Sequence, residues 1–541
     1  MAKPRFYNES TYEKFMKNGK EKEFDMSFDF AVETAKRIFG AKHPMYINGK
    51  AVYAEDVLVE KSPIDNSTII GYFQKGTRDH AKQSIKAAQD AFPLWSNTDY
   101  KRRVEIFRKA AEIFVRDKFI LAAILSFENG KSRYESIGEV DEAIDFLRYY
   151  SDEMESNRGF IRKASIEKSD IKVKLGFQGA PGSNEKVTIS MKPYGVFAVI
   201  SPFNFPVSIS TGMCVGALIC GNTVVFKPSS SDNMTMLTGM KIYQMLTEAG
   251  VPPGAFNFVT GPGSEIGDEL ATNSGVSGVV FTGSRSTGIE MISKNYAAGT
   301  QKVFVVEMGG KNPVIVAASA DIGNAVTGIT SAAFGFAGQK CSACSRIYVH
   351  ESIKEIFISN MIEKIRGFKI GDPLSKENYI GSLISGSAYK RYIESVDKAK
   401  SSGRILYGGN VIGDAQRGYY VEPTIVELRH DHELVHKELF LPLVTIEYFK
   451  DFSKAIDMAN DVEYGLTAGL YSKNRKEINE FSRKIQAGVV YINRPTSATT
   501  GAIVGKHTFV GWKYSGLTGK GTGSKFYLQQ FMREQSISIT K

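Results

Sequence analysis

Short apolar runs alternate with longer amphipathic segments along most of the chain. Apolar residues at helical spacing predict long helices at 78–95, 99–128 and 137–153. From residue 196 onward, apolar runs of strand length alternate with helical patterns in two series, which meet near residues 307–311. Because strands that alternate with helices form βαβ units, each series predicts a parallel sheet covered by helices. The expected fold class is therefore α/β, with two open parallel-sheet layers.

The segments that flank these two series have different patterns. Residues 1–43 are polar with helical spacing and predict an N-terminal helical extension. Residues 155–192 alternate between apolar and polar positions, which predicts a β-hairpin or flap with its turn at 181–184. The tail, 498–541, is rich in glycine and ends in the strand-like stretch EQSISIT, which we expect to pair with this flap or with a second subunit. The expected domains are thus 1–43, 44–154 with 193–306, 307–497, and the flap with the tail.

Composition places the chain among ordinary globular proteins. Of its 541 residues, 42% are hydrophobic and 23% are charged, so neither one small domain nor wholesale disorder fits. The net charge is +10, and half of this surplus lies in the tail. The basic residues of the tail are scattered rather than adjacent, so we expect no nucleic-acid partner.

Membrane and disulfide signals are weak. The most apolar stretch, 194–226, is interrupted by Pro202, Asn204 and Pro206 among others, whereas a membrane span needs about 20 mostly apolar residues. We therefore expect no membrane partner, and the N-terminus shows no apolar signal region. Four cysteines in a chain of this length exclude a disulfide scaffold. These features predict a reducing, cytoplasmic location.

Three polar motifs follow predicted strands, where open α/β sheets bind their ligands. In PFNFP, Asn204 lies between two prolines and is either a rigid amide donor to an oxyanion or a turn residue. Lys227, in VVFKPS, either meets a ribose hydroxyl or phosphate or is a solvated strand end. Gly283 and Ser284, in FTGSRSTG, open a helix whose free N–H groups suit a pyrophosphate, a weak signal on its own.

Two further motifs supply a carboxylate and two thiols. Glu307, in EMGGKNP, ends a predicted strand beside two glycines, and Cys341 and Cys344 follow in GQKCSACSR. A zinc site needs about four ligands, and the histidines between residues 430 and 436 have no cysteine near them, so no metal is expected. A dithiol redox centre needs a thioredoxin-like βαβ setting, which this region lacks. A single nucleophilic cysteine fits better, against the alternative that both are small buried hydrophobes.

The order and spacing of these motifs are far more specific than any one of them. PFNFP, VVFKPS, FTGS, EMGGKNP, GQKCSA and ELFLP occur in this order, with the carboxylate 34 residues before the cysteine. Over residues 40–530 the chain resembles the aldehyde dehydrogenase superfamily. The resemblance implies that Cys341 is the nucleophile, since Cys344 falls outside the family pattern GQxCxA, and that Glu307 is the general base. It also implies an oxyanion hole formed by Asn204 and the backbone N–H of Cys341.

The same resemblance implies a Rossmann-like domain that binds NAD, a catalytic domain, and a homo-oligomer, either a dimer or dimer-based, held by the flap and tail. Glu438 is expected on the nicotinamide ribose. Many members have a glutamate on the adenosine ribose where this chain has Ser230, so NADP remains possible. The usual F-G-P after Glu438 is Phe440-Leu441-Pro442 here. The expected cofactor-binding residues are Ser201, Pro202, Phe203, Lys227, Ser229, Ser230, Gly261, Gly267, Phe281, Thr282, Gly283, Ser284, Gly309, Glu438 and Phe440.

One subfamily, the 1-pyrroline-5-carboxylate (glutamate semialdehyde) dehydrogenases, resembles the chain most. Three stretches carry this likeness: TTGAIVGKHTFVG at 499–511, QKCSACSR around the nucleophile, and EVDEAIDFLRYY at 139–150. The resemblance implies that the substrate carboxylate is bound by the Ser342 hydroxyl and the N–H groups of Gly501 and Ala502, an anion nest. Phe203 and Phe509 are then expected to flank the aliphatic chain. The subfamily's P-F-G-G is replaced around Phe509, with Val510 and Trp512 as the departures.

The function that follows is NAD(P)-dependent oxidation of L-glutamate γ-semialdehyde to L-glutamate in proline catabolism, through a cysteine thiohemiacetal and thioester. One alternative keeps the chemistry and changes the substrate to another semialdehyde or an aliphatic aldehyde. Another is a binding protein built on a retired dehydrogenase. That alternative predicts eroded chemistry, yet Cys341, Asn204 and Glu307 are all present.

Overall fold

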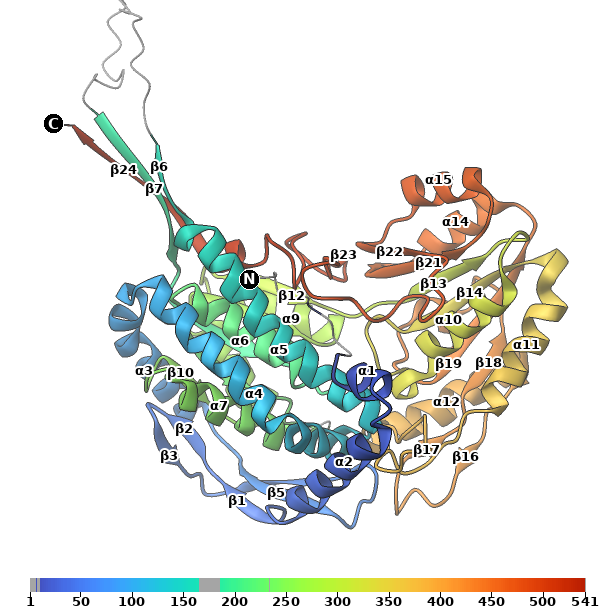
Figure 1. The fold of residues 1–541 in the computed structure, drawn as a ribbon, viewed down its shortest axis with the longest axis horizontal. Coiled ribbons are helices and arrows are strands. Elements are labelled where there is room, and N and C mark those ends of the chain that lie inside the picture. Colours follow the sequence, from blue (N-terminus) through green and yellow to red (C-terminus); the bar gives the residue numbers. More distant parts are fainter. Residues whose placement is uncertain (1–5, 7–9, 165–184, 233, 541) are drawn as a thin grey trace, which may run out of the picture.

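The computed structural model describes residues 6, 10–164, 185–232 and 234–540. Two seven-stranded sheets form the two halves of the molecule (Figure 1). The first has the order β12–β11–β8–β9–β10–β2–β3, with bounds Val303–Glu307, Gly278–Thr282, Val196–Ile200, Thr223–Lys227, Phe256–Phe258, Met45–Ile47 and Lys50–Val52. The second has the order β15–β18–β19–β14–β13–β21–β22, with bounds Arg404–Tyr407, Thr424–Glu427, Leu443–Phe449, Cys344–His350, Asn312–Val316, Thr467–Tyr471 and Val489–Ile492.

The expected α/β class with two parallel layers is confirmed, with one difference at the sheet edges. Strands β12 to β10 run parallel, but β2 and β3 are antiparallel, as is β15 at the edge of the second sheet. β2 and β3 form a hairpin joined by Asn48 and Gly49, both with positive φ, and an antiparallel pair needs no helical crossover. The chain passes between the sheets at residues 308–311, because β12 ends at Glu307 and β13 begins at Asn312.

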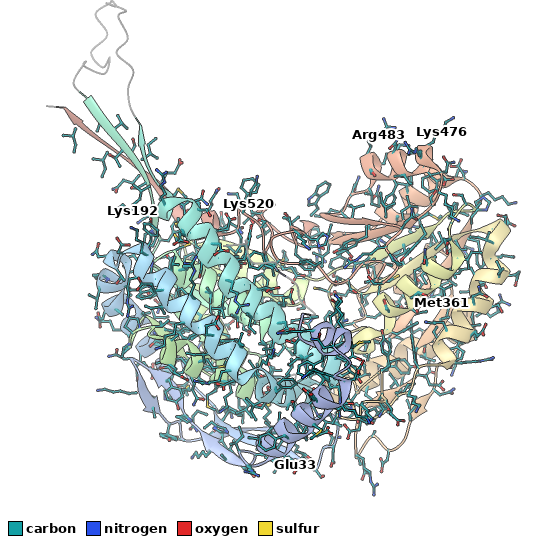
Figure 2. The ribbon with its side chains drawn as sticks, viewed as in Figure 1. Glu33, Lys192, Met361, Lys476, Arg483 and Lys520 are labelled. Carbon is teal, nitrogen blue, oxygen red and sulfur yellow. The ribbon has the colours of Figure 1, made fainter. Side chains whose placement is uncertain are left out.

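Helices cover both sheets, which is why strands such as β8 and β9 are apolar and buried along their length. Those of the first half are α3 (Arg78–Asn97), α4 (Tyr100–Asn129), α5 (Arg133–Ser156), α6 (Ser208–Ile219), α7 (Met236–Ala249), α8 (Asp268–Thr272) and α9 (Arg285–Ala297). Those of the second are α10 (Ile322–Phe334), α11 (Lys354–Arg366), α12 (Gly386–Ser402), α13 (Glu433–His436), α14 (Phe452–Asn460) and α15 (Arg475–Lys484). Figure 2 shows side chains throughout both halves, with Lys476 and Arg483 of α15 at the outer edge of the second.

The predicted long helices are confirmed, and α5 begins four residues earlier than expected. Ser132 caps it by accepting a hydrogen bond from the backbone N–H of Glu135 at 3.4 Å. This cap follows directly on α4, which ends at Gly130 with φ of 76°. The early start places residues 131–139 under the loops of the functional site. No helix in the described part of the chain is long and apolar enough to cross a membrane.

The flap and the tail form a separate antiparallel sheet that projects from the first half (Figure 1). Its order is β24–β7–β6, with bounds Met532–Thr540, Glu185–Pro193 and Ile161–Ala164. The tail strand pairs with the flap over its whole length, from Met532 opposite Pro193 to Thr540 opposite Glu185, which is the first of the two pairings expected. The predicted turn at 181–184 lies outside the described residues.

The N-terminal extension is helical, as predicted, and packs against α4 and α5. Its helices are α1 (Ser10–Lys17) and α2 (Glu21–Lys36). The ring of Phe24 stacks on that of Tyr134 at a centroid distance of 5.9 Å, and Arg133 pairs with Asp25 at 2.9 Å. Smaller elements complete the fold: β1 (Ala41–His43), β4 (Val57–Lys61) and β5 (Ile69–Gln74) form one sheet, β16 (Val411–Ile412) pairs with β17 (Tyr420–Val421), and β20 (Tyr464–Gly465) pairs with β23 (Trp512–Lys513).

Candidate active site

Asn204, Glu307 and Cys341 line one cavity of about 660 Å³ between the two sheets. Asn204 follows β8 and Glu307 ends β12, so both lie at the carboxyl edge of the first sheet. Cys341 precedes β14 and lies at the amino edge of the second sheet. Three segments that are distant in sequence thus meet where the two sheets face each other. The predicted catalytic residues share one site.

The loop that carries Cys341 is fixed by buried amides. Its residues Phe336 and Ala337 have φ of 52° and 50°, a left-handed conformation that non-glycine residues rarely adopt. The amide of Gln339 is fully buried and accepts from Ile384 N–H at 2.9 Å while donating to the carbonyls of Phe336 and Ser382. The Asn312 amide donates to the Cys341 carbonyl at 2.7 Å. The thiol is therefore held on a rigid support.

Cys341 and Glu307 line the same cavity, and each shifts the pKa of the other. Burial raises the pKa of Glu307 to about 7. Burial and the neighbouring Glu307 raise the pKa of the Cys341 thiol well above its usual range. One carboxylate oxygen of Glu307 is buried with no hydrogen-bond partner among the described residues. The pair combines a thiol with a carboxylate that titrates near neutral pH and has a free acceptor.

The Asn204 side chain faces the loop that leads to Cys341. It is 3% exposed, and its Nδ2 donates to the Gln339 carbonyl at 3.2 Å. An amide has a second N–H, so Asn204 retains a donor for a ligand in the cavity.

Fourteen of the fifteen residues predicted to bind the cofactor line this cavity, and Gly261 does not. The carbonyl of Gly261 instead accepts from the Ser230 hydroxyl at 2.5 Å, behind the wall. Its φ of 153° and its packing against Gly76 explain the glycine. Several further lining residues were missed. Thr287 lies in FTGSRSTG but was not singled out, and no motif contains Gly263, Ser264, Asp268, Lys294 or Arg391.

The wall of the cavity fits a phosphate-bearing dinucleotide. The Lys227 ammonium is buried, and its hydrogen-bond partners are the neutral Ser230 hydroxyl at 2.8 Å and the Pro228 carbonyl at 3.3 Å. Burial lowers its pKa to about 8. A Cβ built at Gly263 or Gly267 would meet no atom within 4 Å, so the backbone there borders open space. A buried cation whose partners among the described residues are neutral, together with exposed backbone, suits an anionic ligand.

Glu438 and Phe440 lie where the second sheet faces the cofactor residues. A carboxylate oxygen of Glu438 accepts from Gly310 N–H at 2.8 Å, and burial raises the pKa of Glu438 to about 8. Phe440 has φ of 59°, and its ring contacts that of Phe203 edge-on at 5.7 Å. Leu441, at the position of the usual glycine, is buried in the core of the second half. The replacement therefore adds apolar packing behind Phe440.

Of the five residues predicted to bind the substrate, only Phe203, expected beside the aliphatic chain, lines the large cavity. Ser342 is 6% exposed, and its carbonyl accepts from the Thr499 hydroxyl at 2.6 Å. Gly501 has φ of 76°, and Ala502 follows it on the same loop. Phe509 lines a smaller cavity of about 30 Å³ that Glu307 also lines. The anchor loop is thus bonded, through Thr499, to the residue next to Cys341.

Arg494 supports this loop and was missed in the sequence. Its guanidinium donates to the carbonyls of Thr500 at 2.8 Å and Gly501 at 2.7 Å. The sequence feature that could have marked Arg494 is its position in INRPTS, just before the glycine-rich stretch, and this is a weak signal. A cation bound to these carbonyls fixes the loop that presents the Gly501 and Ala502 backbone.

The departures at Val510 and Trp512 have different surroundings. Val510 lines the smaller cavity, whereas Trp512 is 49% exposed and belongs to β23. Val510 thus remains a candidate for shaping the pocket. Trp512 lies on the surface of the described chain.

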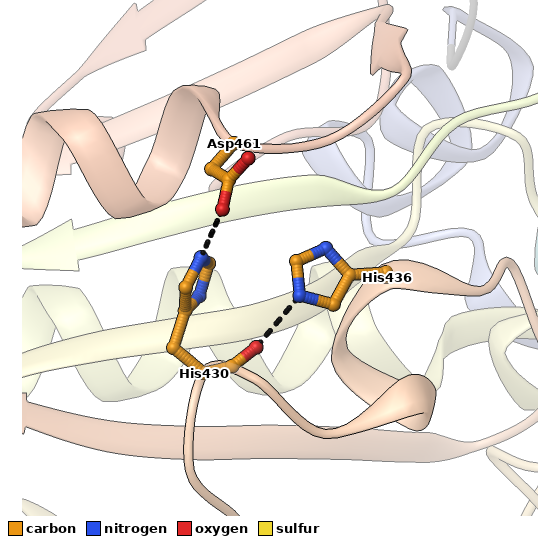
Figure 3. Close-up of side chains that lie close together, drawn as sticks. All are labelled: His430, His436 and Asp461. Carbon is orange, nitrogen blue, oxygen red and sulfur yellow. Dashed lines mark hydrogen bonds and ion pairs between the residues drawn. The ribbon is translucent and has the colours of Figure 1, made fainter.

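A group of two histidines and an aspartate, which no sequence motif marked, supports the turn that leads to Glu438 (Figure 3). His430 Nε2 and an Asp461 oxygen lie 3.0 Å apart, and His436 Nε2 bonds to the His430 carbonyl at 2.7 Å. His430 Nδ1 contacts the Tyr348 hydroxyl at 3.0 Å. One ligand atom from each member lies within 4.8 Å of the others, as in a metal site, but both nitrogens of His430 are already hydrogen-bonded. The group acts as a network that fixes residues 430–436.

Comparisons with known proteins agree with this geometry. The model of the aldehyde dehydrogenase family matches residues 53–537. The 1-pyrroline-5-carboxylate dehydrogenase of Bacillus licheniformis is 35% identical over 520 residues, covering 95% of this chain and 96% of its own. The 1-pyrroline-5-carboxylate dehydrogenase 1 of Halalkalibacterium halodurans is 34% identical over 518 residues, with the same coverage. The crystal structure of the Thermus 1-pyrroline-5-carboxylate dehydrogenase with bound NAD superposes with a TM-score of 0.87, at 31% identity and 95% and 96% coverage.

Proposed function

The chain belongs to the aldehyde dehydrogenase family, and from this premise we propose that it oxidises L-glutamate γ-semialdehyde, the open form of 1-pyrroline-5-carboxylate, to L-glutamate with NAD. The observation that carries the proposal is the meeting of Asn204, Glu307 and Cys341 on one cavity whose far wall fits a dinucleotide. Full-length similarity to 1-pyrroline-5-carboxylate dehydrogenases supports the substrate. The activity places the protein in proline catabolism.

The first half of the reaction forms a carbon–sulfur bond. Glu307, in contact with the thiol, takes the Cys341 proton, and the thiolate attacks the aldehyde carbon. The carbonyl oxygen becomes an oxyanion, which accepts hydrogen bonds from the Asn204 amide and the Cys341 backbone N–H. When bound, NAD supplies the acceptor for the hydride that leaves this carbon.

The second half breaks the thioester that remains on Cys341. Glu307 first releases the thiol proton to solvent; the carboxylate then takes a proton from a water molecule, and the hydroxide attacks the acyl carbon. The carbon–sulfur bond breaks, Cys341 leaves as thiolate, and glutamate is released. The Glu307 oxygen that lacks a partner is available for this second proton transfer. Because the pKa of Glu307 is about 7, the carboxylate forms in the physiological range.

Each half of the molecule has a part in this proposal. The first half, residues 44–154 and 193–306, holds the dinucleotide through Lys227 and the backbone of the glycine loops. The second, 307–497, supplies Cys341 and Glu438. The β24–β7–β6 sheet projects from the body and joins copies of the chain in a dimer-based homo-oligomer. The site of action is the cytoplasm.

Initial rates of the full chain test the proposal. We expect kcat/KM for 1-pyrroline-5-carboxylate to exceed that for propanal by more than about 100-fold, because hydrogen bonds to a charged carboxylate contribute roughly 1.5–3 kcal/mol each. Each substrate is measured with NAD and with NADP, since Ser230 carries no charge that would repel a 2′-phosphate. Equal rates with the two aldehydes would reject glutamate semialdehyde as the preferred substrate, but aldehyde oxidation through Cys341 would stand. No oxidation of any aldehyde would reject both.

A further inference from the structure

The start of α5 lies beneath both loops that form the proposed oxyanion hole. Lys131, in the turn before this helix, has a fully buried side chain. Its ammonium donates to the backbone carbonyl of Asn204 at 2.7 Å and forms an ion pair with Glu139. It also lies 3.7 Å from the ring centroid of Phe205 and 4.5 Å from that of Phe336. One cation thus contacts the Asn204 loop of the first half and the Cys341 loop of the second.

Glu139 extends this contact along the Asn204 loop. One of its oxygens accepts from the N–H of Val207 at 2.7 Å and from that of Ser208 at 3.2 Å, at the start of α6. Lys131 therefore binds the loop at Asn204, and Glu139 binds it three residues later. The segment between them is fixed at both ends by one buried ion pair.

Glu135, on the first turn of α5, makes the matching contacts with the Cys341 loop. One oxygen accepts from Phe336 N–H at 3.1 Å, and the other pairs with Lys340 at 2.6 Å. Lys340 is the residue just before Cys341. Three charged side chains within nine residues of sequence thus join two loops that belong to different sheets.

A buried ion pair is a poor way to gain stability, because desolvating both charges offsets most of their attraction. Apolar residues of the same size would fill this space at no greater cost. What they would lack is a directed donor to the Asn204 carbonyl and an acceptor for the N–H groups of Val207 and Ser208. The buried ion pair therefore fixes the position of the Asn204 loop and adds little to the stability of the core.

We propose that Lys131 is a positioning residue of the oxyanion hole: it sets the distance between the Asn204 amide and the backbone N–H of Cys341. The proposal rests on the proposed function, which assigns the hole. Lys131 does not line the cavity, whereas Asn204 and Cys341 do, so it acts through them and not on the substrate.

The test compares Lys131→Met with Arg133→Met in the full chain. Arg133 is a matched control, because it is a buried cation two residues away whose polar partners in the described part of the chain are Asp25 and Asp29 of α2 and the Leu374 carbonyl, all outside the two loops. A displaced donor typically costs up to about 100-fold in rate. We expect Lys131→Met to lower kcat about 10- to 100-fold while KM for NAD stays within about threefold, and Arg133→Met to lower only the melting temperature.

A second measurement separates positioning from collapse of the site. Alkylation of Cys341 by iodoacetamide needs the thiolate but forms no oxyanion, so its rate should be unchanged in Lys131→Met. The double variant Asn204→Ala/Lys131→Met should be at most about threefold slower than Asn204→Ala alone, because both changes remove one interaction. Lys131→Arg, which keeps a donor to the Asn204 carbonyl, should recover part of kcat.

The outcomes are distinct for the two proposals. If Asn204→Ala itself keeps full activity, the oxyanion assignment of the proposed function fails. If Asn204→Ala loses about 100-fold or more and Lys131→Met keeps wild-type kcat, or if alkylation slows in parallel with kcat, only the positioning role fails. Should Lys131→Met not fold, Glu139→Gln takes its place: it keeps an acceptor for Val207 and Ser208 and removes the charge that holds Lys131. An unchanged kcat in that variant would overturn the proposal.

Discussion

The two sides of the Cys341 site are built in different ways. The cofactor side is made of strand ends and helix starts of the first sheet, and nearly every residue predicted there lines the large cavity. The anchor side is made of Ser342 and residues 499–511 of the tail, and this loop is held to the second half by Thr499 and Arg494. A sheet fixes its strand ends together, whereas a loop is placed only by its individual contacts. Changes on the cofactor side should therefore affect every substrate, and changes on the anchor side only carboxylate-bearing ones.

The largest effect is expected at the thiol that both sides share. Cys341→Ala should lower kcat more than about 10⁴-fold with every aldehyde, since no other group can form the covalent intermediate. Cys344→Ala is the matched control. Cys344 is buried, makes its contact with the Arg346 carbonyl and does not line the cavity, so substantial activity should remain. An inactive Cys344→Ala with an active Cys341→Ala would invert the assignment.

Glu307→Gln should lower the steady-state rate about 100- to 1,000-fold, as expected for loss of a general base. Some acyl-enzyme should still form, which gives a burst of reduced cofactor followed by slow turnover. In the wild type, the carboxylate is the active form and its pKa is about 7, so kcat should rise as the pH increases through 7 and then level off. Stopped-flow absorbance checks the burst, and a pH profile checks the direction. A steady-state rate equal to wild type would remove Glu307 from the mechanism.

Lys227→Met tests the cofactor side alone. Losing a buried cationic donor should raise KM for NAD about 10- to 100-fold, because bonds to charged groups contribute roughly 1.5–3 kcal/mol. The increase should be the same with 1-pyrroline-5-carboxylate and with propanal as second substrate, since Lys227 lies on the cofactor wall. A change confined to one aldehyde would place Lys227 near the substrate and break the distinction between the two sides.

Ser342→Ala tests the anchor side and should give the smallest effect. KM for the semialdehyde should rise about 10-fold, with kcat little changed, because the hydroxyl binds a part of the substrate that does not react. Propanal has no carboxylate and should not respond. Equal losses with both aldehydes would mean that Ser342 supports Cys341 instead, which its place next to the thiol also allows.

Most of the fold could be predicted from the sequence, because the spacing of apolar residues shows which face of each helix or strand is buried. The alternation of strands and helices from residue 196 gave both sheets, and the alternating patterns at 155–192 and in the tail gave the strands that pair as β7 and β24. The antiparallel edge strands and the early start of α5 were not predicted, since they depend on a turn and on one cap at Ser132. The site was predictable as a set because its motifs follow strands. The individual roles of its residues stay predictions.

The sequence by itself determined the two parallel layers and the identity of the groups that meet between them: a thiol, a carboxylate, an amide and a lysine. Only the tertiary structure decided that Gly261 lies outside the cavity lining, that the anchor loop is bonded to the residue after Cys341, and that Lys131 joins the Asn204 and Cys341 loops. The physical reason is the separation along the chain of the residues that interact. Helix and strand patterns record burial over a few neighbouring residues, whereas the Lys131–Asn204 bond and the Thr499–Ser342 bond join residues 73 and 157 positions apart and exist only once both sheets are packed.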